Sequence, residues 1–230
     1  MTNTLKVVRE LKENNQDFEW YPTTDAMIEA IKKYAEKNGY DKLNMYSVLD
    51  CGGGDGRVVS QLGREKFIIE KSKHLINLCD KNICVVGTDF HCTTLIDKEV
   101  STVFSNPPYK EYEQWASKIL LEANCENIFL IIPQRWKTSP MILAALEKRN
   151  IKNWKIIAST DFLDAERQAR AKVDIIHFDL KQRSYNPYKN VQDPFDLWFE
   201  EAFKFKKKTT TTNEIDTTDL LNSLIANYNK

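Results

Sequence analysis

The chain has 230 residues, of which 42% are hydrophobic, and its 33 Lys and Arg side chains balance 33 Asp and Glu side chains. These values are ordinary for one soluble globular domain with a core of normal size. The sequence contains neither a signal peptide nor an apolar run of membrane-spanning length, so we expect a cytoplasmic protein without a membrane partner.

The five cysteines are odd in number, lack the Cys-x-x-Cys spacing and have no histidines clustered near them. This usage predicts reduced thiols, with neither disulfides nor a metal site. A formal net charge of zero argues against a nucleic-acid partner, but the charge is unevenly distributed. Residues 130–190 contain 12 Lys and Arg side chains against 6 Asp and Glu side chains, which indicates a basic region in that half of the chain.

In chain order, the first predicted helix covers residues 24–37, with Thr24 as its N-cap and Met27, Ile31 and Tyr34 at helical spacing. After it, short continuous apolar runs alternate with helical patterns, which is typical of a parallel sheet covered on both faces. The predicted strands are 46–50, 66–70, 83–88, 101–105, 127–132, 154–159 and 173–180, and the further helices are 56–62, 72–80, 110–123 and 139–149. The sequence therefore predicts an α/β fold, with no helix between the last two strands.

Four of the seven glycines lie between residues 52 and 56, directly after an apolar strand that ends in Asp50. Glycine is required where the backbone adopts positive φ and passes close to a ligand. Gly52, Gly54 and Gly56 do not have the spacing that places a pyrophosphate on a helix N-terminus. They resemble instead the Asp/Glu-x-Gly-x-Gly-x-Gly signature of class I S-adenosylmethionine-dependent methyltransferases. A glycine-rich turn without a ligand, or a nucleotide loop of another kind, is the alternative.

The second motif is Asn106-Pro107-Pro108-Tyr109, which ends the predicted strand 101–105. Two prolines end a strand because each lacks an N–H and fixes φ. The tetrapeptide is similar to the catalytic motif of methyltransferases that act on an exocyclic or amide nitrogen of adenine, guanine or glutamine. This resemblance implies that Asn106 and the Pro107 carbonyl accept hydrogen bonds from the substrate amine, that the prolines aim these acceptors, and that Tyr109 stacks on a planar substrate. A proline turn with an exposed tyrosine is the alternative.

The resemblance covers about residues 19–183 and implies a Rossmann-like, mostly parallel seven-stranded sheet whose last strand is antiparallel, with helices on both faces. In this family the acidic residue and the glycine turn hold the ammonium-bearing methionine end of S-adenosylmethionine. Glu70 is implied to bind the ribose hydroxyls, Asp89 the adenine amino group, and Phe90 the adenine ring. The implied cofactor residues are Tyr21, Thr23, Asp50, Gly52, Gly54, Gly56, Glu70, Asp89, Phe90 and Asn106.

Tyr21 and Thr23 belong to a segment, 18–24, that resembles the Tyr-Pro-Thr segment of phage and bacterial adenine methyltransferases. In those enzymes the segment precedes the first helix and closes over the methionine portion of the cofactor. The competing interpretation is a hydrophobic staple and helix cap, and both interpretations are compatible.

Two predicted loops carry candidate substrate residues. The first follows the fifth strand with two cations for phosphates and an indole for a base. The second, 161–172, is a longer connection than a hairpin needs, and long ordered loops in compact domains tend to be functional. The candidates are Arg135, Trp136 and Lys137 in the first loop and Arg167, Arg170 and Lys172 in the second. Solvated surface charges are the alternative for both loops.

These resemblances favour a DNA adenine-N6 methyltransferase of the small phage or bacterial kind, with the target adenine flipped into a pocket near Asn106. Its partner is then duplex or single-stranded DNA. Because no separate recognition domain fits in the chain, specificity is relaxed or supplied by another protein. Two alternatives stay open: the same chemistry on a protein glutamine or an RNA base, and a non-catalytic cofactor-binding regulatory subunit.

The sequence predicts a catalytic domain followed by a linker and a C-terminal helix. That domain is expected over residues 1–205, including the cofactor-closing segment 18–37 and a helix from Asp193 to Phe205 whose aromatic side chains dock on the domain. A polar linker, 206–215, and an amphipathic helix, 216–230, follow. That helix either packs on its own domain or contacts a protein partner or a second copy of the chain.

Overall fold

The computed structural model describes residues 4–37, 45–181 and 190–203. The chain divides into two compact units, Met1–Phe199 and Glu200–Lys230, and the sheet and the helices that cover it belong to the first unit. The predicted linker 206–215 and the predicted helix 216–230 lie outside the described residues.

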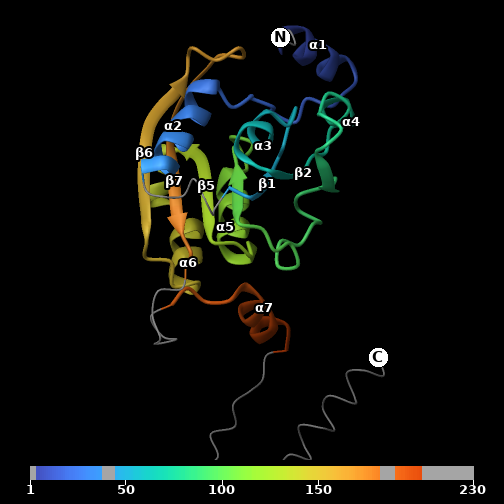
Figure 1. The fold of residues 1–230 in the computed structure, drawn as a ribbon. Helices are drawn as coiled ribbons and strands as arrows, with labels where there is room; N and C mark the ends of the chain where they lie inside the picture. Colours follow the sequence, from blue (N-terminus) through green and yellow to red (C-terminus); the bar gives the residue numbers. More distant parts are fainter. Residues whose placement is uncertain (1–3, 38–44, 182–189, 204–230) are drawn as a thin grey trace, which may run out of the picture. The chain divides into compact units, whose positions relative to one another are not determined.

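Seven strands form one sheet in the order β3-β2-β1-β4-β5-β7-β6 (Figure 1). β1, β2, β3, β4 and β5 pair in parallel, whereas β7 is antiparallel to both of its neighbours, β5 and β6. The predicted sheet with an antiparallel last strand is therefore confirmed. The strands are β1 (Ser47–Cys51), β2 (Glu65–Ile69), β3 (Cys84–Gly87), β4 (Thr102–Ser105), β5 (Asn127–Pro133), β6 (Trp154–Phe162) and β7 (Ala169–Asp179).

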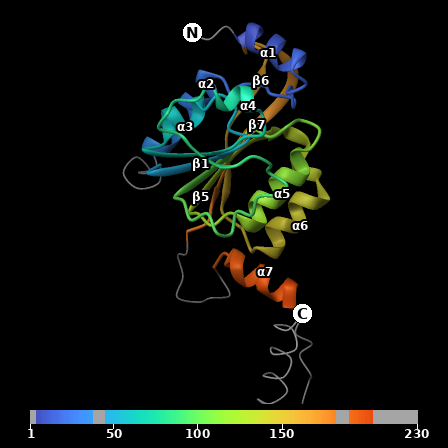
Figure 2. The ribbon, with the colours of Figure 1, turned by 90° about the vertical axis from the view of Figure 1, so that its right-hand side faces the viewer.

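Helices cover both faces of the sheet (Figure 2). Alternate residues of a strand point to opposite faces, so each apolar strand contributes side chains to two hydrophobic cores, one on each face of the sheet. Val48 and Phe104 pack in the core under α2 and α3, and Leu49 and Val103 pack in the core under α5 and α6. The helices are α1 (Thr4–Glu13), α2 (Asp25–Lys37), α3 (Arg57–Leu62), α4 (Lys73–Ile76), α5 (Tyr112–Glu122), η2 (Gln134–Thr138, a 3₁₀ helix), α6 (Pro140–Lys148) and α7 (Pro194–Phe203).

Three local differences from the prediction affect the site. Helix α1 was not expected; it forms because Val7 and Leu11 pack on Leu75 of α4. The predicted helix 72–80 is helical only over α4. Strands β6 and β7 extend toward each other, so the predicted connection 161–172 is a short loop over 163–168.

Helix α7 keeps its aromatic side chains at the surface. Phe195, Trp198 and Phe199 are each more than a third exposed, so the prediction that these rings dock on the domain is wrong.

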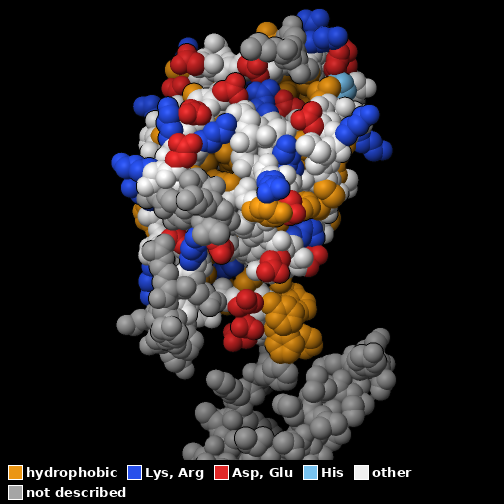
Figure 3. All heavy atoms as spheres, in the orientation of Figure 1, with side chains coloured by type: hydrophobic (Ala, Val, Ile, Leu, Met, Phe, Trp, Pro, Cys, Tyr) orange, Lys and Arg blue, Asp and Glu red, His pale blue; other side chains and the backbone are white. Residues whose placement is uncertain are grey.

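On the face shown in Figure 3, basic and acidic side chains are interspersed, as the zero net charge suggests. Within the described residues, no helix combines the length and apolar character that a bilayer crossing requires.

Candidate active site

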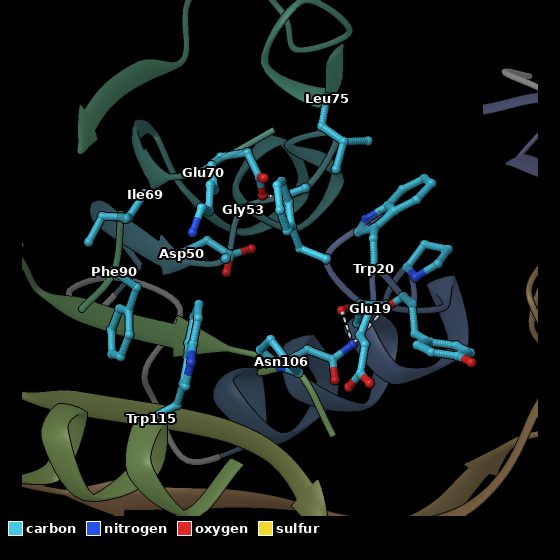
Figure 4. Close-up of a pocket in the computed structure, with 18 of the residues that line it drawn as sticks. Glu19, Trp20, Asp50, Gly53, Ile69, Glu70, Leu75, Phe90, Asn106 and Trp115 are labelled. Atoms are coloured by element: carbon cyan, nitrogen blue, oxygen red, sulfur yellow. Dashed lines mark hydrogen bonds between the residues drawn. The ribbon is translucent and has the colours of Figure 1, made fainter. Parts of the chain in front are cut away.

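A pocket of about 380 Å³ lies at the carboxyl ends of the parallel strands (Figure 4). Ligands of open α/β sheets bind at this edge. Asp50 of β1, Glu70 after β2, Phe90 after β3 and Asn106 after β4 all line the pocket, as predicted from their positions at strand ends. Residues 16–23, which we call the N-terminal strap, line it as well, and Figure 4 shows Trp20 of this strap across the pocket from Phe90.

The glycine turn has the backbone conformation that its sequence predicts. Gly52, Gly54 and Gly56 have φ values of 87°, 56° and 76°, which disfavour any residue with a Cβ. A Cβ on Gly54 would lie 2.5 Å from Nε1 of Trp20, and one on Gly52 would lie 3.2 Å from Trp115. The close approach at these two positions is therefore made by the protein's own indole rings.

Asp50 is a buried carboxylate with an unused hydrogen-bonding atom. The residue is 2% exposed, and its Oδ1 is buried without a hydrogen-bond partner. Burial raises the pKa of Asp50 well above its ordinary value, and the neighbouring Glu70 and Asp55 carboxylates add to the shift. A cation placed in the pocket would relieve both the desolvation and the repulsion between these carboxylates.

Glu70 holds the glycine turn against the second strand. Its carboxylate accepts hydrogen bonds from the backbone N–H of Gly54, at 2.8 Å, and of Ser72, at 2.7 Å. Burial raises the pKa of Glu70, although these backbone hydrogen bonds oppose the shift. The implied ribose contact stays a prediction, and the geometry adds a positioning role that the sequence did not suggest.

Asp89 and Phe90 lie together after β3, and both line the first pocket. Burial alone would raise the pKa of Asp89. The carboxylate also accepts a hydrogen bond from the backbone N–H of His91 and pairs with Lys71, and together these contacts outweigh burial, so the pKa of Asp89 is lowered. Phe90 is stacked on Trp115, with ring centroids 3.9 Å apart and an interplanar angle of 15° (Figure 4). Trp115 therefore covers one face of the Phe90 ring, and the implied stacking of Phe90 on adenine stays a prediction.

Asn106 is held by the N-terminal strap. Its Nδ2 donates to the Tyr21 carbonyl at 2.9 Å and to Oγ1 of Thr23 at 3.3 Å. Both amide hydrogens are thereby used, so Oδ1 is the side-chain atom that can accept a hydrogen bond from a substrate. The structure brings together Tyr21, Thr23 and Asn106, which the sequence grouped as one site.

A second pocket, of about 360 Å³, adjoins the first. It has largely apolar walls that include Pro133, Phe162 and Val173, and the predicted residues Pro107 and Tyr109 line it together with Arg170. Four residues line both pockets: Glu19, Tyr21, Asn106 and Lys110. A group that passes from one pocket to the other must cross this boundary.

Arg167 does not face an open surface. Its guanidinium forms two hydrogen bonds with the Asp17 carboxylate, at 2.8 and 3.0 Å, donates to the Trp20 carbonyl and lies 4.2 Å from the centre of the Tyr21 ring. These contacts tie the loop between β6 and β7 to the strap. The prediction that Arg167 tracks a nucleic-acid backbone is therefore corrected to a role in positioning the strap.

The predicted loop after β5 is the 3₁₀ helix η2, and its side chains also differ from their prediction. Trp136 is 1% exposed and donates from Nε1 to the Asp174 carboxylate, so its ring has no face open to a base. Lys137 pairs with the same carboxylate at 3.0 Å. Arg135 donates to the Tyr112 hydroxyl and lies 4.8 Å from the centre of the Tyr109 ring, on an exposed part of the loop.

Several contributors to the site were missed by sequence reasoning. Trp20 and Trp115 form walls of the first pocket, and Glu19 and Lys110 stand on the boundary between the pockets. Glu19 lies in the segment 18–24 and Lys110 directly follows Tyr109, so both adjoin predicted site residues, but their residue types alone did not mark them. No group of three metal-ligating side chains occurs among residues 4–37, 45–181 and 190–203.

Comparison with known proteins gives the fold. Neither a protein-family model nor a curated protein matches the sequence. Among solved structures, the 23S rRNA methyltransferase ErmE matches with a TM-score of 0.55 at 15% identity, over 82% of this chain and 80% of that one. A dimethyladenosine transferase from Plasmodium falciparum matches with a TM-score of 0.54 at 12% identity, over 70% of this chain and 63% of that one.

A third similar structure is the E. cuniculi Mtq2–Trm112 complex, described as responsible for methylation of the translation termination factor eRF1. It matches with a TM-score of 0.51 at 17% identity, over 70% of this chain and 99% of that one. This chain therefore has the Rossmann-like methyltransferase fold. The match spans less than two thirds of the Plasmodium protein.

Proposed function

We propose that this protein is an S-adenosylmethionine-dependent methyltransferase that transfers a methyl group to N6 of adenine in DNA. The observation that carries the proposal is the shared boundary at Asn106, where a pocket with an unpartnered buried carboxylate adjoins a pocket with largely apolar walls. The methyltransferase fold, found also in proteins that act on rRNA and on a translation factor, supports the reaction class.

The first pocket fits the cofactor. S-adenosylmethionine supplies a methyl group on a positively charged sulfur, and its methionine end carries an ammonium group. The orphaned Oδ1 of Asp50 suits that ammonium, and the glycine turn that follows Asp50 lines the same pocket. Glu70 and Asp89 are the carboxylates proposed to accept from the ribose hydroxyls and from the adenine amino group.

Asn106 and the Pro107 carbonyl are proposed to prepare the acceptor. The lone pair of an exocyclic amine is delocalised into its ring, so the amine is a poor nucleophile. Two acceptors that draw its hydrogens toward tetrahedral geometry localise the lone pair for in-line attack. The hydrogen bonds from Nδ2 to the strap fix the amide so that Oδ1 is available for this task.

The second pocket supports a nucleobase as the acceptor. Tyr109, Phe162 and Pro133 give it apolar and aromatic surface on which a flat ring can stack, and Arg170 places a cation at its wall for a phosphate. A base must leave its stack to reach such a pocket. The excess of basic residues over 130–190 favours DNA or RNA over an acidic protein surface.

A protein glutamine or an RNA base is the second candidate acceptor. The zero net charge of the whole chain favours it over DNA, since duplex DNA binding depends on basic charge. A non-catalytic cofactor-binding subunit is disfavoured because Asp50, the glycine turn and Asn106 are all present and converge.

The test is transfer of a labelled methyl group. The protein is incubated with labelled S-adenosylmethionine and, separately, with duplex DNA, single-stranded DNA, RNA and a glutamine-containing peptide, and each acceptor is digested for mass spectrometry. We expect N6-methyladenine from DNA. Label in RNA or glutamine alone would move the assignment to the second candidate, and cofactor binding in calorimetry without label in any acceptor would favour the non-catalytic subunit.

A further inference from the structure

Glu19 is the carboxylate at the boundary between the two pockets, and no motif accounts for it. It lines both pockets, together with Tyr21, Asn106 and Lys110. Figure 4 shows Glu19 beside Asn106 at the strap side of the first pocket. The methyl group and the acceptor nitrogen must meet at this boundary, so a negative charge here bears directly on the transfer.

The backbone of Glu19 is held in a conformation that a side chain rarely adopts. Its φ is 58°, in the left-handed region. Such a conformation persists only where the surrounding contacts impose it, and it is concentrated at functional sites. The contacts are evident on both sides: Arg167 donates to the carbonyl of the next residue, Trp20, and Lys110 binds the Glu19 side chain.

The charged groups around the Glu19 carboxylate come from two other elements. Nζ of Lys110 lies 2.9 Å from Oε1, and the Lys110 backbone N–H donates to Oε2 at 3.4 Å, both from the loop after Pro108. Arg170 of β7 lines the second pocket with Glu19. The Lys110 ammonium is well exposed, so its ion pair with Glu19 is weak and exchangeable.

Given the proposed function, we propose that Glu19 stabilises the positive charge that arrives on the acceptor nitrogen and takes the proton that this nitrogen loses. The nitrogen lone pair bonds to the methyl carbon, and the electron pair of the broken C–S bond stays on the sulfur of the sulfonium donor. Once the C–N bond has formed, one of the two N–H protons leaves its hydrogen bond to Asn106 or to the Pro107 carbonyl, passes to the Glu19 carboxylate and is then released to solvent. The charge that began on sulfur thereby leaves as a proton.

The test compares Glu19→Gln, which keeps the shape and removes the charge, with Lys110→Gln, which breaks the same ion pair and keeps the carboxylate. The binding probe is sinefungin, an S-adenosylmethionine analogue with a carbon in place of the sulfur and an amino group in place of the transferable methyl group. Calorimetry gives the affinity ratio of sinefungin to S-adenosylhomocysteine for each protein. We expect Glu19→Gln to lower that ratio at least tenfold and Lys110→Gln to preserve it.

The kinetic readout is the pH profile of kcat. Glu19→Gln should lower kcat by about 100- to 10,000-fold, the range of a lost proton acceptor, and remove the limb in which activity rises as a carboxylate ionises. Lys110→Gln should retain this limb. If the two variants had the same ratio of sinefungin to S-adenosylhomocysteine affinity and the same pH profile of kcat, Glu19 would only hold the N-terminal strap in place, and the assignment would be overturned. A wild-type protein that binds neither probe would overturn the proposed function itself.

Discussion

Replacing Asp50 with Asn separates the stability of the fold from affinity for the cofactor. The carboxylate is 2% exposed, lacks a partner for Oδ1 and stands near two other carboxylates. A buried polar group without a partner costs about 1–3 kcal/mol and a charged one more, so a neutral amide of the same shape removes the part of the cost that the charge adds, about 1–3 kcal/mol. Without ligand, Asp50→Asn should therefore raise the free energy of unfolding by about 1–3 kcal/mol, at about 2–4 °C in Tm for each kcal/mol.

The pH dependence of this gain has a defined sign. The folded state raises the pKa of Asp50, so it binds the proton more tightly than the unfolded chain does. The stability that this proton contributes is complete below the ordinary carboxyl pKa and is lost as the pH rises through the raised one. The difference in Tm between the variant and the wild type should therefore widen over this range and then level off.

The affinity for the cofactor should change in the opposite direction. A hydrogen bond to a charged group contributes about 1.5–3 kcal/mol, so S-adenosylhomocysteine should bind Asp50→Asn about 10- to 150-fold more weakly. Differential scanning calorimetry and isothermal titration calorimetry measure the two effects. Asp97→Asn, the same change at an exposed carboxylate, is the control and should alter neither. A variant that is less stable at every pH and binds normally would refute the reasoning.

Four further substitutions test the rest of the site. Asn106→Ala should reduce kcat about a hundredfold or more while the affinity for S-adenosylhomocysteine changes less than tenfold, because Oδ1 acts on the acceptor. Equal losses of kcat and of this affinity would contradict the assignment. Gly54→Ala should weaken cofactor binding about tenfold or more, since a Cβ at positive φ would meet Trp20, and normal affinity in calorimetry would count against it. Arg167→Gln should lower Tm, because it releases Asp17, without changing how DNA affinity depends on salt. Arg170→Gln should instead reduce the slope of the logarithm of DNA affinity against the logarithm of salt concentration by about 0.9. An equal slope change in both variants would restore Arg167 as a phosphate ligand.

The features that sequence could predict are those fixed by short-range physics. Continuous apolar runs such as 127–132 specify strands covered on both faces, and the glycine turn after Asp50 requires positive φ whatever surrounds it. Strand ends of a parallel sheet meet at one edge, so Asp50 and Asn106 had to converge once the strand order was known.

The features that sequence could not predict depend on partners far along the chain. Arg167 is bound by Asp17, 150 residues away, and Trp136 is buried because Asp174 on β7 accepts its N–H. From local sequence both look like exposed residues of basic loops. Likewise, Phe90 is covered by Trp115 from α5, a contact that depends on how the helix lies on the sheet.

A crystal structure of the protein with S-adenosylhomocysteine and adenosine tests the central claim most directly. We expect the ammonium group at Asp50 Oδ1, the sulfur at the boundary lined by Asn106, and the adenine N6 at about 3 Å from Asn106 Oδ1. A cofactor bound elsewhere, or an adenine whose N6 points away from Asn106, would contradict the account.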